Sequence, residues 1–345
     1  MIIRLIVIVS LLVGCTEYPA STTCGQTGSL YRQASYPIGV ALDMMELNSS
    51  AEYQTIATEQ FNSITPENIF KAESIHPERG FYNWLETDSL MSYCERTQKR
   101  VHGHTLIWHV QLPEWIRSFQ GTKADWELLM KEHIQTIMTR YKGRIVGWDV
   151  VNEAFNEDGT LRNSIWRQHI GDSYIEKAYR FAREADPNAL LFYNDYNLEV
   201  SPTKRAAVIT YFNNIRLRGV KIDGIGLQMH ISIVHPGSSE IASALMDVSA
   251  NEYKVHISEL DISVNPLGKN ITATTELLGE QANLMGAILL HYRQLPTKHQ
   301  YGITFWGVSD RNSWIRSTYN RIDYPLLYDD NYQPKPMYCK AIELL

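Results

Sequence analysis

The sequence is short of cysteine and of positive charge, and it lacks the glycine-rich loop of nucleotide-binding sheets. Its 345 residues include four cysteines but no Cys-x-x-Cys pair, which argues against a zinc site or a dithiol redox centre. The formal net charge is −6, so the chain as a whole has no basic footprint for nucleic acid. No glycine-rich phosphate loop follows an early apolar run, as a doubly wound nucleotide-binding sheet would usually require. With 44% hydrophobic and 20% charged residues, an ordinary globular core is expected.

The first residues resemble an export signal, because the apolar run at the N-terminus is too short to span a bilayer. Arg4 gives a positive start and residues 5–13 are apolar, whereas a transmembrane helix needs ~20 apolar residues. The run ends Leu12-Val13-Gly14-Cys15, which resembles the bacterial lipobox, in which the cysteine is lipidated and becomes the new N-terminus. We therefore interpret residues 1–15 as a signal peptide and Cys15 as a lipidation site. We expect an exported, membrane-anchored bacterial lipoprotein, periplasmic or on the cell surface, with plain secretion as the alternative.

Residues 16–35 are expected to form a tether, because small and polar residues prevail after Cys15. One acyl chain holds a protein only weakly at a membrane, so stable anchoring needs more than one. Lipidation of Cys15 would leave Cys24, Cys94 and Cys339, an odd count. Two of these three can form a disulfide, and all three pairings stay open at this point.

Short apolar runs alternate with amphipathic segments over residues 36–345, which predicts a (β/α)8 TIM barrel of the α/β class. Strands that alternate with helices favour a parallel sheet, and one such barrel needs ~250 residues or more. One helix is expected over residues 126–141 from its apolar spacing. Another is expected behind Ser173-Tyr174-Ile175-Glu176, which has the pattern of a capping box, and Pro187 ends it. A doubly wound open sheet is the alternative. The expected strands are residues 38–42, 62–65, 100–107, 145–151, 190–193, 224–227, 254–262 and 302–306.

Two carboxylates at run ends are the strongest candidates for catalysis. In a barrel of this kind the catalytic groups sit at the C-terminal ends of the strands. Glu153 ends the fourth run and Glu259 lies in the seventh, so both side chains should meet at the barrel mouth. Glycoside hydrolysis needs two such groups beside one bond, one protonated and one ionised. The alternative for either glutamate is a structural salt bridge at a strand end.

Seven motifs in order give the chain a close resemblance to the endo-1,4-β-xylanases of glycoside hydrolase family 10, over residues 36–345. The chain departs from the family pattern at Ser258, where the family often has threonine, and in a short segment over residues 231–249. The motifs are Ile64-Thr65-Pro66-Glu67-Asn68 with Lys71, Gly103-His104-Thr105-Leu106-Ile107-Trp108-His109, Trp148-Asp149-Val150-Val151-Asn152-Glu153, Tyr193-Asn194-Asp195-Tyr196-Asn197, Gly226-Leu227-Gln228-Met229-His230, Ser258-Glu259-Leu260-Asp261-Ile262 and Phe305-Trp306-Gly307-Val308-Ser309-Asp310.

The resemblance implies a retaining enzyme that cuts the xylan backbone through a covalent glycosyl-enzyme intermediate. Glu153 would be the general acid/base and Glu259 the nucleophile. His230 would support the nucleophile by a hydrogen bond, with Asp261 orienting the imidazole, and Asn152 would hold the 2-hydroxyl of the sugar that is cleaved. The expected ligands are xylan and xylo-oligosaccharides. No cofactor, no metal, no nucleic acid and no obligate protein partner is implied. Contact with a membrane is expected only through the lipid anchor.

The same resemblance assigns a set of sugar-binding residues. Trp306 and Trp314 would form an apolar wall, and Gln111 with Trp314 would crowd the hydroxymethyl group that glucose carries and xylose lacks. Tyr196 and its neighbour Asn197 would line the leaving-group side. The residues expected on the non-reducing side are Glu67, Asn68, Lys71, His104, Trp108 and Gln228, with His230 also near the sugar. The remaining tryptophans, Trp84, Trp115, Trp126, Trp148 and Trp166, are expected in the core.

Three other functions compete with this interpretation. A metal-dependent barrel hydrolase would use His102 and His104 as a ligand pair, but such a pair belongs on the first strand and here lies in the third run. A sugar-binding protein on an inactive barrel would not need Glu153 and Glu259 together. A retaining cellulase or mannanase would share the fold and the carboxylates, and would differ in its substrate.

Overall fold

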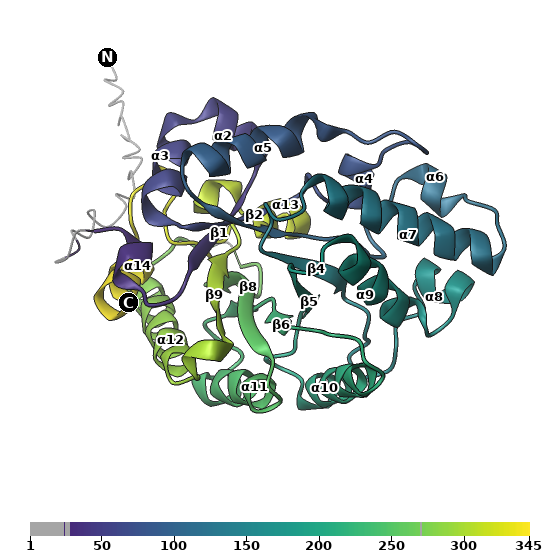
Figure 1. Cartoon of the computed structure of the whole chain (residues 1–345). Coiled ribbons are helices and arrows are strands. Elements are labelled where there is room, and N and C mark those ends of the chain that lie inside the picture. Colours follow the sequence, from purple (N-terminus) through teal and green to yellow (C-terminus); the bar gives the residue numbers. More distant parts are fainter. Residues whose placement is uncertain (1–23, 25–27, 270) are drawn as a thin grey trace, which may run out of the picture.

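The computed structural model describes residues 24, 28–269 and 271–345 and confirms the (β/α)8 barrel. Within them, eight parallel strands close on themselves, because β1 pairs with β9 and β6 pairs with β8. A ninth strand, β7, pairs in parallel with the last three residues of β8. Figure 1 shows the strands surrounded by helices. The strands are β1 (Ile38–Leu42), β2 (Ser63–Pro66), β3 (Arg100–Gly103), β4 (Gly147–Asn152), β5 (Leu190–Asp195), β6 (Gly224–Leu227), β7 (His230–Ser232), β8 (Lys254–Ser263) and β9 (Gln300–Phe305).

The helices lie between the strands in the order that a (β/α)8 chain requires. Both expected helices form, and the one behind Ser173 ends before Pro187. No helix among the described residues is long and apolar enough to cross a membrane. The helices are α1 (Leu30–Gln33), α2 (Met44–Ser49), α3 (Ala51–Gln60), α4 (Ala72–Ile75), α5 (Trp84–Arg96), α6 (Glu114–Arg117), α7 (Lys123–Arg140), α8 (Ile165–Ile170), α9 (Tyr174–Ala185), α10 (Pro202–Leu217), α11 (Ser238–Ala250), α12 (Thr275–Arg293), α13 (Trp314–Tyr319) and α14 (Pro336–Leu344).

The capping box expected at the start of α9 is wrong. Ser173 is the N-cap residue, but its backbone is helical (φ −74°, ψ −5°) and its side chain makes no capping hydrogen bond. A capping serine normally has an extended backbone, which aims its oxygen at the free N–H groups of the first turn. Glu176 instead pairs with Arg180 and Arg218.

Rings fill the N-terminal half of the barrel interior. His102 and His256 lie 4.7 Å apart between ring centroids, and Phe192 lies 4.3 Å from Tyr301. A Cβ atom at Gly224 would lie 2.1 Å from the Phe192 ring, so only glycine lets β6 pass it. This packed layer is the floor on which the site at the other end of the strands rests.

The tryptophans divide between core and surface. Trp126, Trp148 and Trp166 are fully buried, as expected for core residues. Trp84 and Trp115 are only half-buried and pack against the edge of the hydrophobic core, so the expectation that they belong to it holds only in part. Both lie near α4 and α7, on the outer side of the barrel.

The two ends of the described chain are joined. Cys24 and Cys339 form a disulfide, and Cys94 is free and buried. Helix α1 lies against α14, and Leu30 is fully buried. Packed structure therefore begins before Tyr36, within the range 16–35 that was expected to be a tether. Cys15 and the rest of the expected signal peptide lie outside the described residues.

Candidate active site

Glu153 and Glu259 are both held in place by the barrel backbone at the C-terminal ends of the strands. Glu153 follows β4, and its backbone N–H donates to the Asn194 carbonyl on β5 (2.9 Å). The φ of Glu153 is +56°, a left-handed conformation that a residue with a side chain adopts at a cost. Glu259 lies within β8, and its N–H donates to the Gln228 carbonyl after β6 (3.0 Å). The two carboxylates are therefore positioned by strands rather than by mobile loops.

The carboxyl group of Glu153 is surrounded by neutral donors. The Trp108 indole donates to Oε2 (2.9 Å), and the Gln228 amide donates to Oε1 (3.0 Å). The Asn152 amide donates to the same Oε1 (3.3 Å). These bonds fix the orientation of the carboxyl group, which forms no ion pair within the described part of the chain. Such surroundings suit a group that must both give and take a proton.

The carboxyl group of Glu259 is buried and held in its ionised form. Burial alone raises the pKa of Glu259, but a hydrogen bond from His230 and the charge of His104 outweigh it, so that the pKa is lowered. The contact from His230 Nε2 to Oε2 measures 3.1 Å. Asn194 Nδ2 donates to Oε1 at 2.7 Å. An ionised carboxylate with its in-plane lone pairs directed by donors is what a nucleophile requires.

His230 is itself oriented by the residue expected to do so. Asp261 Oδ2 contacts His230 Nδ1 at 2.8 Å, on the side of the ring opposite Glu259. Burial lowers the pKa of His230, but Asp261 and Glu259 together raise it well above its ordinary value. The ring therefore carries a positive charge between two carboxylates. The Trp314 indole donates to the same Asp261 oxygen (2.8 Å), which joins the aromatic wall to this network.

Asn194, at the end of β5, connects the two candidate catalytic groups. Its Nδ2 donates to Glu259 and also to Asn152 Oδ1 (2.9 Å), and Asn152 in turn donates to Glu153. The Ser258 hydroxyl donates to Asn194 Oδ1 (2.6 Å). The departure from threonine at Ser258 thus keeps the hydroxyl group that this amide needs. Sequence reasoning did not assign Asn194 a role, although its position at a strand end was a usable signal.

The expected sugar-binding residues of β2 and of the loop after β3 come together. Lys71 Nζ donates to Asn68 Oδ1 (3.0 Å) and lies 5.3 Å from the centroid of the Trp108 ring. Burial raises the pKa of Glu67 to about 7, and Lys71 opposes that rise. Gln111 lies further along this loop, with a left-handed φ of +46°. These polar groups lie on the Trp108 side of Glu153.

His104 and Asp149 form a buried pair beneath this side of the site. His104 Nδ1 contacts Asp149 Oδ2 at 2.9 Å, and His102 Nε2 contacts the other oxygen at 3.0 Å. The two imidazoles that a metal site would need therefore face one carboxylate. No group of three His, Cys, Asp or Glu side chains in the described part of the chain is arranged to hold a metal ion.

Trp306 and Trp314 flank His230 as the expected wall. The His230 ring lies 4.8 Å from Trp314 and 6.3 Å from Trp306 between centroids. Trp306 follows β9 and is buried, and its backbone N–H donates to the Leu260 carbonyl (3.1 Å). Trp314 is the first residue of α13, where Ser313 caps the helix.

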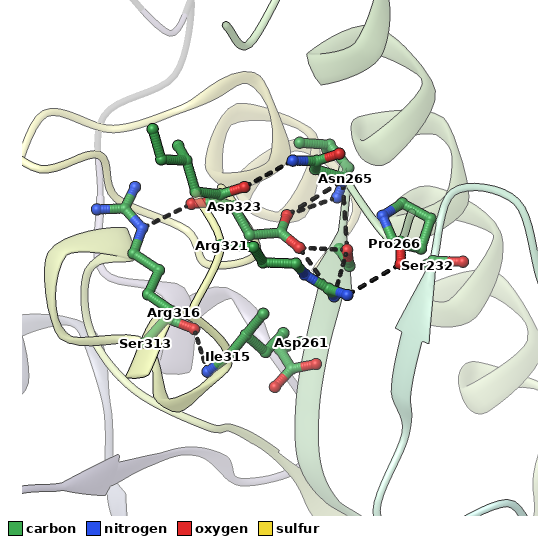
Figure 2. A network of polar contacts seen from close by, with 12 residues as sticks. Ser232, Asp261, Asn265, Pro266, Ser313, Ile315, Arg316, Arg321 and Asp323 are labelled. Carbon is green, nitrogen blue, oxygen red and sulfur yellow. Dashed lines mark hydrogen bonds and ion pairs between the residues drawn. The ribbon is translucent and has the colours of Figure 1, made fainter. Parts of the chain in front are cut away.

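A polar network centred on Asp323 fastens α13 to the end of β8 (Figure 2). The buried Asp323 carboxylate accepts from the backbone N–H groups of Val264 (3.0 Å) and Asn265 (3.2 Å) and pairs with Arg321 (3.2 Å). Arg316 of α13 donates to the Asp323 carbonyl (2.8 Å). Sequence reasoning missed this network, because nothing in the motifs marks Asp323. It fixes the helix that carries Trp314 relative to the strand that carries Glu259.

Tyr196, which was expected on the leaving-group side, is linked to Glu153 through Arg162. Its hydroxyl accepts from Arg162 Nη2 (2.8 Å), and Arg162 Nε donates to the Glu153 carbonyl (2.9 Å). The fully buried Lys204 lies 3.8 Å from the Tyr196 ring centroid and pairs with Asp195 (2.9 Å). Arg162 and Lys204 were missed, since neither belongs to one of the motifs.

Comparison with known proteins agrees with this geometry. A family model described as Glycosyl hydrolase family 10 matches residues 27–344. Endo-1,4-beta-xylanase B of Thermotoga neapolitana is 37% identical over 299 residues, which cover 87% of this chain and 85% of that protein. Xylanase 10B of Thermotoga petrophila RKU-1 was solved in complex with xylobiose and superposes on this chain with a TM-score of 0.86 at 35% identity. The superposition covers 92% of this chain and 98% of that one. Exoglucanase XynX of Acetivibrio thermocellus is 36% identical over 323 residues. The matched part covers 88% of this chain but only 28% of that longer protein.

Proposed function

The chain belongs to glycosyl hydrolase family 10, a retaining family, and we propose that it is an endo-1,4-β-xylanase with Glu153 as general acid/base and Glu259 as nucleophile. The contrast between the two carboxyl groups carries the proposal. Glu259 receives hydrogen bonds from a charged imidazole and an amide, whereas Glu153 receives them from neutral groups only. Pairs of carboxyl groups in such different surroundings take different roles in acid–base catalysis.

In the first step Glu259 attacks the anomeric carbon of the sugar while Glu153 protonates the leaving oxygen. The bond from that carbon to the leaving oxygen breaks, and an ester bond to Glu259 forms. The negative charge of Glu259 is consumed in this bond. His230 then keeps its pairing with Asp261, so its position is preserved while its bond to Glu259 weakens.

In the second step Glu153, now ionised, takes a proton from water that attacks the same carbon. The ester to Glu259 breaks, and the sugar leaves with its original anomeric configuration. Asn152 uses one amide hydrogen on Glu153, which leaves its second amide hydrogen for the 2-hydroxyl of the sugar. Hydrogen bonds to the 2-hydroxyl strengthen in the transition state.

We assign the preference for xylose to Gln111 and Trp314, which would restrict the space for a hydroxymethyl group. Excluding one such group is worth ~1–3 kcal/mol, so weak activity on glucans is expected beside the main activity on xylan. The similarity to a protein named exoglucanase makes cellulose the substrate to test against.

Export and lipidation of Cys15 complete the proposal. The bond between Cys24 and Cys339 supports export, because disulfides persist in oxidising compartments and are rare in the cytosol. Metabolic labelling with a palmitate analogue should mark the full-length protein and fail to mark the Cys15→Ser variant. Label on that variant would place the anchor elsewhere.

The catalytic proposal is tested by the products that the enzyme releases. Digestion of unbranched xylan should give short xylo-oligosaccharides, whose first-formed reducing ends are β-anomers by NMR. Carboxymethyl cellulose should be cut far more slowly. Release of α-anomers would contradict double displacement, and faster cleavage of the cellulose derivative would contradict the substrate.

A further inference from the structure

A cavity of about 550 Å³ lies on the outer side of the barrel, between the loop after α4 and the helices α6 and α7. Figure 1 shows these three helices together on one side of the molecule. The lining includes none of the residues assigned above to catalysis or sugar binding. The cavity is therefore separate from the cleavage site.

Aromatic rings form one wall of this cavity. Tyr82 stacks on His76 with centroids 3.9 Å apart, and Trp84 stacks on the other side of Tyr82 at 5.0 Å. Trp115 meets the His76 ring edge-on at 4.6 Å, and its indole donates to the His76 carbonyl (2.9 Å). Tyr82, Trp115 and Phe119 are only half-buried. They leave apolar ring surface open to solvent, which a ligand with an apolar face could cover.

The hydrogen bonds behind this wall determine the protonation of His76. His133 Nε2 lies 3.1 Å from the Leu106 carbonyl, which only accepts, so Nε2 carries the hydrogen. Burial lowers the pKa of His133 to about 3, which leaves the ring neutral and its Nδ1 an acceptor. His76 Nδ1, 3.0 Å away, must therefore be the donor in that pair.

His76 lines the cavity and consequently carries one unused acceptor. Burial lowers the pKa of His76 to about 4, so at neutral pH its second nitrogen, Nε2, carries only a lone pair. That nitrogen is buried and has no hydrogen-bond partner among the described residues. A buried polar atom without a partner is uncommon in proteins, and an ordered water or a ligand group that reaches it would satisfy it. A ligand hydroxyl group is a suitable donor.

Charges of both signs lie in the same lining. Arg79 offers donors and lies over the Phe119 ring (5.2 Å), while Asp125 and Glu132 offer acceptors. A lining of mixed charge does not select an anion or a cation. Open aromatic surface, an acceptor without a partner and polar groups of both kinds together fit a neutral ligand with apolar ring faces and several hydroxyl groups, which is a sugar chain.

We propose that this cavity is a second binding site for a β-1,4-linked xylose chain, which holds the polymer at the enzyme surface while another part of it is cut. The choice of xylose rests on the proposed function, because xylan is the polymer that this chain would meet as substrate. The site positions polymer and takes no part in bond cleavage.

The test uses the full chain with Glu259→Gln, which stops turnover, and follows tryptophan indole signals by ¹⁵N NMR as xylohexaose is added. Trp115 reports on the cavity, and Trp108 and Trp314 report on the cleavage site. We expect all three signals to shift. If only Trp108 and Trp314 shift, the second site is refuted and the proposed function stands. If only Trp115 shifts, the cavity binds sugar and the assigned cleavage site is wrong; if none shifts, both are refuted.

A blocking variant with a matched control localises the binding. Leu128, on α7, is half exposed and lines the cavity, and Leu217, on α10, is exposed on a different helix. In the Glu259→Gln background, Leu128→Arg should abolish the Trp115 shift and Leu217→Arg should leave it intact. In the active enzyme, Leu128→Arg should bind insoluble xylan about tenfold more weakly, while its kcat/KM on xylotriose stays unchanged. Equal adsorption of the two leucine variants would overturn the proposal.

Discussion

Asn194 Nδ2 lies 2.7 Å from Glu259 Oε1, so an amide from β5 holds one oxygen of the carboxylate that β8 supplies. The same nitrogen donates to Asn152, the residue that contacts Glu153. The orientation of both glutamates therefore depends on one side chain between them. Three strands of the barrel, β4, β5 and β8, meet at this amide.

Asn194→Ala should reduce kcat on xylan about 10- to 100-fold, because a hydrogen bond to a charged group contributes ~1.5–3 kcal/mol. The loss of a donor to Glu259 should also raise the pKa of that group, which moves the acid limb of the kcat/KM profile to higher pH. Ser258→Ala is the matched control, since it removes a contact to Asn194 but none to Glu259. An unshifted acid limb in Asn194→Ala would show that the amide has only a structural role.

Glu153→Gln should separate substrates by their leaving groups. The amide cannot donate a proton as a carboxylic acid does, so xylan should be cleaved about 10²- to 10⁴-fold more slowly. Aryl xylobiosides with a nitrophenolate leaving group need no protonation in the first step, so the rate of that step should fall far less for them. Steady-state kinetics on both substrates, with burst measurements on the aryl glycoside, checks this. Equal losses on the two substrates would contradict the role of Glu153 as the acid.

Asp261→Asn should shift the pH dependence of the enzyme without removing a carboxylate from the reaction. Asp261 contributes to the raised pKa of His230, and His230 is the strongest of the influences that lower the pKa of Glu259. Without Asp261, His230 loses its proton more easily, and burial raises the pKa of Glu259. Because Glu259 reacts in its ionised form, the acid limb of kcat/KM should move to higher pH. A profile that falls uniformly at all pH values would instead indicate damage to the fold.

The eight barrel strands could be predicted because parallel strands are buried on both faces and appear as continuous apolar runs. The short β7 was missed because Met229, with φ +62°, turns the chain after β6 and leaves a strand of only three residues. Ser173 shows the reverse error, since a sequence pattern for a cap does not determine the backbone angles that the cap needs.

The site residues divide in the same way. Glu153 and Glu259 belong to apolar runs that end at the barrel mouth, so the barrel implied their meeting, whereas the role of His230 came from the family resemblance. Asn194 also ends a strand, but its partners Glu259 and Asn152 come from other strands, so the sequence marked its position and not its role. Lys204 lies on α10, and its burial beside Asp195 appears only in the folded chain. A buried amide or ammonium group has no signature of its own until those partners are in place.

Asp323 should be far more important for stability than its distance from the motifs suggests. Asp323→Ala leaves the Arg321 charge and the backbone N–H groups of Val264 and Asn265 without their acceptor, which should cost about 3–5 kcal/mol in the free energy of unfolding. Asp330→Ala is the control: it also removes a carboxylate that pairs with an arginine of this region, Arg316, but Asp330 is 41% exposed and should cost less than ~1 kcal/mol. Urea unfolding of both variants measures the difference.

Asp323→Ala should also raise KM. Arg316 of α13 binds the Asp323 carbonyl, so a shift of the chain at Asp323 would move α13 and with it Trp314. Comparable stability losses in the two variants would show that the network in Figure 2 does not anchor α13.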